Sequence, residues 1–210
     1  MERNTRIVAA LAVAMLAAAD GAAQPRRPGI VVHLRSGGTI PGEHVLDAEA
    51  RARRIFEAIG VSIRWVNDDS KCRPGDRQDV LDIDVRVLST DATDSFLANT
   101  SVSRDALGMA IVSTTRVYIF GGRIRDVARS QRNVPVLFGR VLAHEIGHLI
   151  LPDAGHSETG IMRADLSSAG PIVDPGFTPS QAESIRRRLS GRMLDPVGNG
   201  RQGFAALETD

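Results

Sequence analysis

The sequence feature that most constrains this chain is the pattern His144-Glu145-x-x-His148, which lies inside a strongly apolar stretch. On an α-helix, residues four apart share one face, so His144 and His148 can present two imidazoles to one cation. Glu145 points about 100° away from His144 and is better placed to hold a water molecule than to bind the metal. Because apolar residues cover several faces of this helix, we expect it to be buried, and a metal ion would then compensate the buried imidazoles and carboxylate.

A hydrolytic zinc site has this composition: the metal lowers the pKa of a bound water toward about 7, and a carboxylate takes the proton. Such a site also needs a third protein ligand, and His156 is the favoured candidate. Pro152 disfavours helical geometry at Leu151, so we expect the helix to stop there. Gly155 allows the chain to reverse, which would return His156 to the helix end.

Other residues near and far could replace His156 as the third ligand. Asp153 and Glu158 are the nearer carboxylate alternatives, and Glu183 is the distant one. The two remaining histidines, His33 and His44, are interpreted as ordinary residues of a strand and of a helix start.

The stretch HEIGHLILPDAGHSETGIM resembles the active site of the metzincin clan of zinc metallopeptidases, and most of all its matrixin-type members. The clan's pattern is H-E-x-x-H-x-x-G-x-x-H followed by a methionine. In this chain Leu151 holds the place of the glycine, the third histidine comes two residues later, and Ala164 stands where a proline is frequent. The resemblance implies three zinc ligands, a general base and the methionine of a Met-turn beneath the metal: His144, His148 and His156, Glu145, and Met162.

Hydrophobic periodicity predicts an α+β fold with strands and helices in a defined order. The expected strands are 30–34, 61–66, 81–88, 107–113 and 115–120, and the expected helices are 43–59, 123–129, one opening at Pro135, and one from Thr178 to about residue 189. Residues 90–104 are expected to form an irregular loop. The resemblance implies a single zincin-like domain of the metzincin type. Such a domain has a mixed twisted sheet, an active-site helix, a Met-turn and a C-terminal helix, with segment 107–113 at the edge that pairs with substrate.

The N-terminus has the composition of a signal peptide. Arg3 and Arg6 precede an apolar run from residue 7 to 19 that is too short to span a membrane comfortably, and residues 21–23 are small. We therefore predict a signal peptide at 1–23, a catalytic domain at 24–190 and a flexible tail at 191–210. The product would be extracytoplasmic, either secreted or periplasmic, with no stable membrane association after cleavage.

The charge balance, 26 basic against 25 acidic residues for a net charge of +1, predicts no nucleic-acid partner. Cys72 is the only cysteine, so no disulfide can form within the chain, and it is interpreted as a loop thiol. The sequence carries no signal for the oligomeric state.

Two functions compete on these observations. The first is a secreted zinc-dependent endopeptidase that cleaves peptide or protein substrates with a metal-activated water, Glu145 being the general base. The alternative is a secreted zinc-binding module without proteolytic activity, which the lengthened turn before His156 would favour. The intact Glu145 favours the enzyme, because a structural zinc site has no use for it.

Overall fold

A computed structural model of the protein describes residues 28–67, 80–98, 100, 102–103, 105–128, 130–151, 153, 155–166 and 174–194. The predicted signal peptide, Cys72 and the chain after Leu194 lie outside these described residues.

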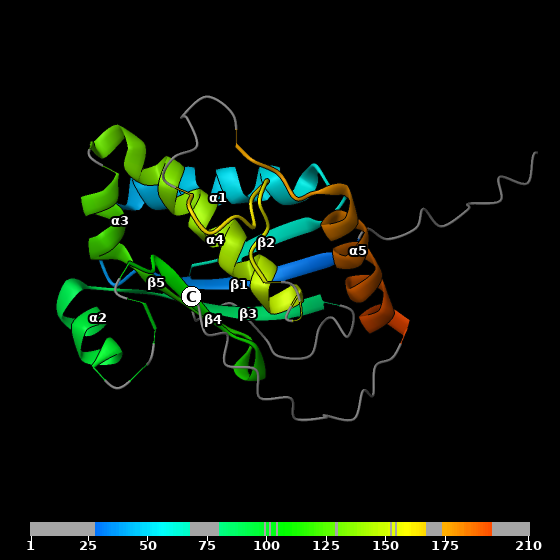
Figure 1. Ribbon diagram of the computed structural model, residues 1–210, viewed down its shortest axis with the longest axis horizontal. Helices are drawn as coiled ribbons and strands as arrows, with labels where there is room; N and C mark the ends of the chain where they lie inside the picture. Colours follow the sequence, from blue (N-terminus) through cyan, green and yellow to red (C-terminus); the bar gives the residue numbers. More distant parts are fainter. Residues whose placement is uncertain are drawn as a thin grey trace, which may run out of the picture.

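The centre of the molecule is a five-stranded sheet with the strand order β2-β1-β3-β5-β4 (Figure 1). Strands β2, β1, β3 and β5 run parallel to one another, whereas β4 pairs antiparallel with β5 at one edge. The predicted mixed sheet is therefore confirmed. Its strands are β1 (Gly29–Arg35), β2 (Ser62–Val66), β3 (Val80–Leu88), β4 (Gly108–Ile111) and β5 (Arg116–Phe120).

Alternation along β3 explains how the sheet buries one face. Ile83 and Val85 point into the core and are fully buried, whereas Asp82 and Arg86 lie on the opposite face and are exposed. This period of two is the pattern of a strand that packs on one side only. The buried face of the sheet is covered by helices.

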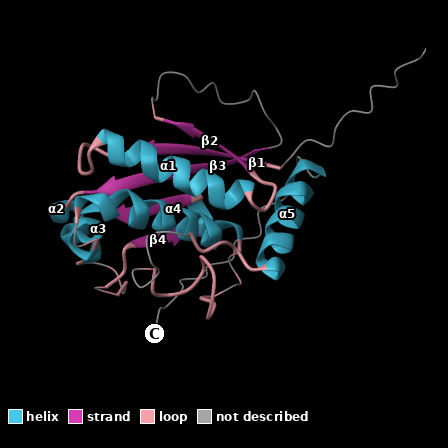
Figure 2. Cartoon of the chain, turned by 90° about the horizontal axis from the view of Figure 1, so that it is seen from above, coloured by secondary structure: helices cyan, strands magenta, loops and turns pink. Residues whose placement is uncertain are grey.

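Helices α1 (Gly42–Glu57) and α4 (Val134–Ile150) lie side by side over this face (Figures 1 and 2). They approach closely at Gly139, where an added Cβ would lie 2.8 Å from the backbone oxygen of Ala48. Asp174 accepts hydrogen bonds from Arg51 of α1 and Arg140 of α4, which joins the two helices a second time. This packing fixes the position of α4 relative to the sheet.

The expectation of an irregular loop at 90–104 is wrong for its first half, because Thr90–Leu97 forms helix α2. Ser89 caps this helix, its side chain accepting a hydrogen bond from the backbone N–H of Ala92. Phe96 then packs on Tyr118 of β5, with ring centroids 4.5 Å apart. A tertiary contact therefore stabilises a short helix for which the local pattern is weak.

Helix α3 (Gly121–Val127) begins directly after β5, two residues earlier than predicted, and helix α5 (Pro179–Leu194) runs beyond the predicted end at residue 189. The predicted start of α5 is confirmed. Thr178 donates its backbone N–H to Oε1 of Gln181 at 2.9 Å, and its own hydroxyl accepts from the N–H of Gln181, which is a capping box. Helix α5 lies at the opposite end of the sheet from α2 and α3 (Figures 1 and 2).

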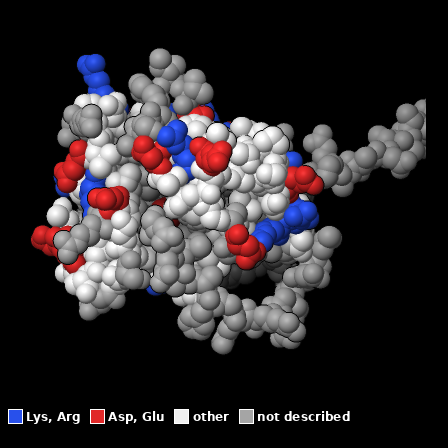
Figure 3. Space-filling model, viewed as in Figure 1, with Lys and Arg blue, Asp and Glu red and all other residues white. Residues whose placement is uncertain are grey.

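The surface of the described residues has mixed charge. On the face shown in Figure 3, acidic and basic side chains are interspersed, and neither sign gathers in a large patch. None of the helices in the described part of the chain is both long and apolar enough to span a bilayer.

Candidate metal centre

The last turns of helix α4 carry two histidines and a glutamate in an apolar environment. His144, Glu145 and His148 are 5%, 7% and 7% exposed, among apolar neighbours such as Ile146 and Leu149. The helix has proline in its first turn and ends at Ile150, with Leu151 as its C-cap, as predicted. The last turns of a buried helix thus form one wall of the site.

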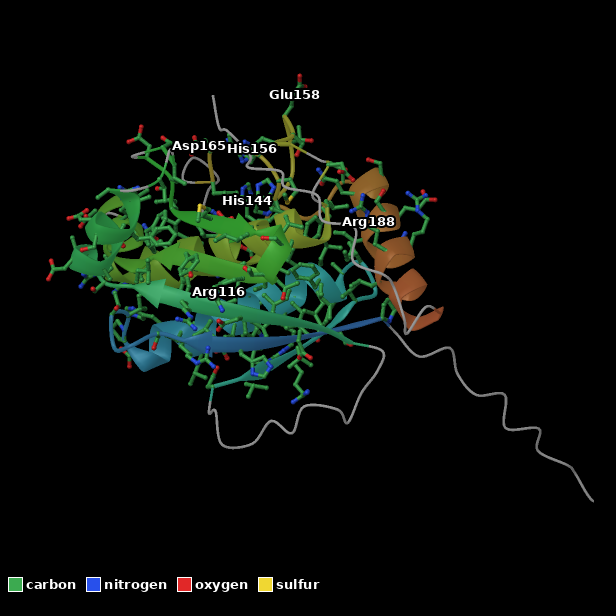
Figure 4. All side chains as sticks on the ribbon, turned by 90° about the horizontal axis from the view of Figure 1, so that it is seen from below. Arg116, His144, His156, Glu158, Asp165 and Arg188 are labelled. Atoms are coloured by element: carbon green, nitrogen blue, oxygen red, sulfur yellow. The ribbon has the colours of Figure 1, made fainter. Side chains whose placement is uncertain are left out.

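Three imidazoles converge at the end of this helix. Nε2 of His148 lies 3.0 Å from Nε2 of His144, and the turn that follows the helix brings His156 toward both rings (Figure 4). Within the described residues, these three histidines form the group whose ligand atoms all lie within 4.8 Å of one another. The two helix rings are 4.6 Å apart between centroids, whereas the ring of His156 is 5.2 Å from each of them. The two rings on the helix are therefore closer to each other than either is to the ring of His156.

A backbone carbonyl determines the tautomer of His144. Its Nδ1–H donates to the carbonyl oxygen of Ile161 at 2.9 Å, so the lone pair is on Nε2, which faces the cluster. Ile161 is itself held by a hydrogen bond from its N–H to the oxygen of Gly176. Hydrogen bonds of this kind orient metal-binding histidines in many proteins. The buried Nδ1 of His148 has no hydrogen-bond partner among the described residues.

Burial keeps the imidazoles neutral at physiological pH. It lowers the pKa of His144 to about 4 and, with the neighbouring His144 and His156, that of His148 to about 3. Burial also lowers the pKa of His156. The neutral imidazole is the form that binds a metal, so protons compete with a cation here only in acid.

Glu145 projects toward the edge strand of the sheet. A Cβ added to Gly108 of β4 would lie 2.8 Å from Oε1 of Glu145 and 2.9 Å from its Cγ, so the carboxyl side chain occupies the space above this glycine. Burial raises the pKa of Glu145 to about 8. A cation held by the adjacent imidazoles would favour the ionised carboxylate instead.

Met162 is fully buried beneath α4. A Cβ added to Gly147 would lie 2.5 Å from Sδ of Met162, so the glycine on the helix leaves the space that the sulfur fills. The carbonyl of Met162 accepts the N–H of Ser157 at 2.8 Å, which closes the loop behind His156. Met162 thus packs directly against the helix that carries the two histidines.

The alternative ligands lie away from the imidazole cluster. Asp153 pairs with Arg188 at 2.6 Å, and Glu158 points outward from the turn (Figure 4). Glu183 is exposed on α5. The other histidines are also elsewhere: His33 lies on β1 near Asp82, and His44 lies in the first turn of α1.

The donor set suits a zinc ion. Zinc bound by histidine has Zn–N distances of about 2.0–2.1 Å, which places tetrahedral ligand atoms about 3.3 Å apart. The separation of 3.0 Å between the two Nε2 atoms on the helix is close to that value. With three protein ligands in the cluster, a fourth position remains for water or substrate.

Sequence reasoning did not identify two glycines that shape this site, Gly108 and Gly147. Both had a local signal, because glycine inside a strand or a helix lowers stability and frequently marks a close approach of another group. Which group approaches could not be predicted, since Glu145 is 37 positions from Gly108, and only the fold brings them together.

No protein-family model matches this sequence, and no curated protein matches it. Among solved structures, the chain is similar to a zinc-dependent peptidase from Methanocorpusculum labreanum, with a TM-score of 0.51 and 13% identity, over 75% of this chain and 100% of that one. It is also similar to archaemetzincin from Methanopyrus kandleri, with a TM-score of 0.45 and 14% identity, over 80% of this chain and 99% of that one. At this identity the first likeness concerns the fold.

Proposed function

We propose that this protein is a zinc-dependent endopeptidase that acts outside the cytoplasm. The observation that carries the proposal is the convergence of three neutral imidazoles at the end of a buried helix, next to a buried carboxyl group. The named activity of the Methanocorpusculum labreanum structure, which shares the fold, agrees with it. The extracytoplasmic location rests on the signal-peptide pattern of residues 1–23.

His144, His148 and His156 would hold the zinc ion, with the Ile161 carbonyl orienting the first of them. When bound, zinc supplies a Lewis acid that acidifies water and polarises a carbonyl group. Glu145 would accept the proton of the attacking water at a carboxylate oxygen and pass it to the leaving amine. Met162, packed against Gly147, would support the helix from below as the methionine of a Met-turn.

Strand β4 would bind the substrate. It is one of the two edge strands of the described sheet, and a Cβ added to Gly108 within it would lie 2.8 Å from Oε1 of Glu145. An extended peptide that pairs with β4 would run past this carboxyl group, and pairing of this kind uses backbone hydrogen bonds. An edge strand next to this carboxyl group therefore suits a peptide or protein substrate.

The test is cleavage of a diverse peptide mixture, read by mass spectrometry, with zinc content measured on the same samples. We expect the wild-type protein to cleave, and Glu145→Ala to retain zinc while losing nearly all turnover, about 10²–10⁴-fold or more. Glu158→Ala, which removes an exposed carboxylate from the neighbouring turn, is the matched control and should cleave like the wild type.

Peptide cleavage by Glu145→Ala at the wild-type rate would contradict the assigned mechanism. A wild-type protein that binds zinc but cleaves no peptide would contradict the endopeptidase and favour the zinc-binding module.

A further inference from the structure

The turn that carries His156 is exposed and longer than the pattern of the resembling clan requires. Helix α4 ends at Ile150, and the N–H of Leu151 still bonds to the oxygen of Gly147 at 2.8 Å. Leu151 is buried, whereas the Asp153 side chain is 83% exposed. An exposed turn does not by itself hold a ligand at a metal site, since ordering it costs conformational entropy.

Arg188 of helix α5 binds both the helix end and this turn. Its Nη1 donates to the carbonyl oxygen of Ile150 at 3.2 Å, and its Nη2 donates to Oδ2 of Asp153 at 2.6 Å. The last carbonyls of a helix lack partners within the helix, and a basic side chain can satisfy them. The guanidinium of Arg188 therefore connects the end of α4 to the first part of the turn.

Gln181 binds the other end of the turn. Its Nε2 donates to Oγ of Ser157 at 3.2 Å, immediately after His156, while its Oε1 caps the start of α5. Gln181 and Arg188 are seven residues apart, so they lie on one face of α5, two helical turns from each other. The two side chains thus contact the turn on both sides of the third imidazole.

Helix α5, which makes these contacts, is itself packed against the core. Ile185 and Leu189 anchor it in the core, and Arg186 donates to the carbonyl oxygen of Ile59 beyond α1. The labels in Figure 4 show Arg188 on α5 and His156 on the turn, with His144 next to His156.

We infer that Arg188 and Gln181 are positioning residues that hold Asp153 and Ser157, on either side of His156, so that His156 reaches the metal; the inference rests on the proposed zinc site. When a ligand occupies its binding geometry for only a fraction of the time, the apparent affinity for the metal falls by that fraction. Because Arg188 and Gln181 of α5 bind the residues on both sides of His156, this fraction should depend on α5.

The Arg188–Asp153 pair is not expected to contribute much to global stability. The two side chains are 39% and 83% exposed, and exposed ion pairs contribute about 0–1 kcal/mol to folding. Loss of an interaction that orients a metal ligand, by contrast, weakens metal binding by about 10–100-fold. Measurements of metal affinity and of folding stability can therefore distinguish a positioning role of Arg188 from a purely structural one.

The experiment measures Zn²⁺ affinity of the full chain, stripped of metal, by competition with a chromophoric chelator, and records the visible spectrum of the Co²⁺ form. We expect Arg188→Met to weaken Zn²⁺ binding about tenfold and to reduce the absorption of four-coordinate Co²⁺. The melting temperature of the metal-free protein should stay near that of the wild type. Arg187→Met, an exposed arginine on the same helix, is the matched control and should change none of these values.

Two further variants keep the test decisive if Arg188→Met folds poorly. Asp153→Asn removes the charge of an exposed partner and should weaken binding less than Arg188→Met does. Gln181→Glu retains an acceptor for the capping box and removes the amide donor to Ser157, so it should weaken binding without shortening α5.

The reference variants are His144→Ala and His156→Ala. If both weaken Zn²⁺ binding while Arg188→Met, Asp153→Asn and Gln181→Glu bind like the wild type, the positioning role is overturned and the metal site stands. If neither histidine variant weakens binding, the proposed zinc site itself is wrong.

Discussion

Glu145 is the residue whose environment has the largest consequence for the metal-free protein. Burial raises its pKa to about 8 from an ordinary value of 4.5, so the folded state binds this proton more tightly than the unfolded chain does. Stability that depends on this group is therefore present below pH 4.5 and is lost as the pH rises toward 8. Ionisation of the buried carboxyl, at pH values near and above 8, destabilises the fold unless a cation compensates the charge.

This reasoning predicts that Glu145→Gln stabilises the metal-free protein at pH 8 by about 1–3 kcal/mol and has little effect at pH 4. Glutamine cannot ionise, so the variant avoids a buried charge while filling nearly the same space. Urea unfolding in the presence of a chelator at pH 4, 6 and 8 measures the difference. Glu158→Gln, at an exposed position, is the control, and a stability difference independent of pH would show that folding does not raise the pKa of Glu145.

At the scale of elements, the approach of β4 to α4 sets the position of the carboxyl group. A Cβ on residue 108 would lie 2.8 Å from Oε1 of Glu145 and 3.0 Å from the backbone oxygen of Tyr118. The edge strand thus touches the side chain that we propose to be the general base. Glycine, which has no Cβ, is the one residue that avoids both short contacts.

We therefore predict that Gly108→Ala displaces Glu145 and lowers kcat about 10–100-fold, because an error of about 1 Å in a reacting group costs on that order. Zinc content should not change, since the three imidazoles do not touch Gly108. Steady-state kinetics on the best peptide from the cleavage screen, with metal analysis, measures both. The control is Leu46→Ala, an exposed position on α1 outside the proposed site, and an unchanged kcat in Gly108→Ala would mean that Glu145 tolerates the new methyl group.

For the whole molecule, the hydrophobic core does not depend on the metal. The core includes buried residues from every strand that packs under α1 and α4, such as Val32, Ile83 and Ile119, and the metal site occupies only one end of α4. Unlike a small zinc finger, a domain of this size buries enough apolar surface to fold alone. Metal binding should therefore add stability to a fold that already exists.

Removal of the metal with a chelator is thus expected to leave the far-UV circular dichroism unchanged and to lower Tm. At a free Zn²⁺ concentration of 100 times Kd the loss is about 2.7 kcal/mol, or roughly 5–10 °C. Re-addition of Zn²⁺ should restore Tm in the wild type and less completely in His156→Ala. Loss of the helical signal on chelation would show instead that folding requires the metal.

The sequence by itself determined the features that depend on local spacing. Residues four apart share a helix face whatever the fold, so His144 and His148 had to point the same way once the helix formed. Alternation in residues 81–88 identified a one-sided strand, and the Thr178–Gln181 pair identified the start of the last helix, because each pattern acts within a few residues. The mixed sheet followed from the order of these elements.

Only the tertiary structure decided the features that join distant segments. Phe96 of α2 packs on Tyr118 of β5 and stabilises that helix, and α5 brings Arg188 to Asp153 in the turn before His156. Spacing favoured His156 over Asp153 as third ligand, and the path of the turn brings the ring of His156 to the two helix imidazoles. Contacts across such separations depend on how helices pack on the sheet, which no local pattern specifies.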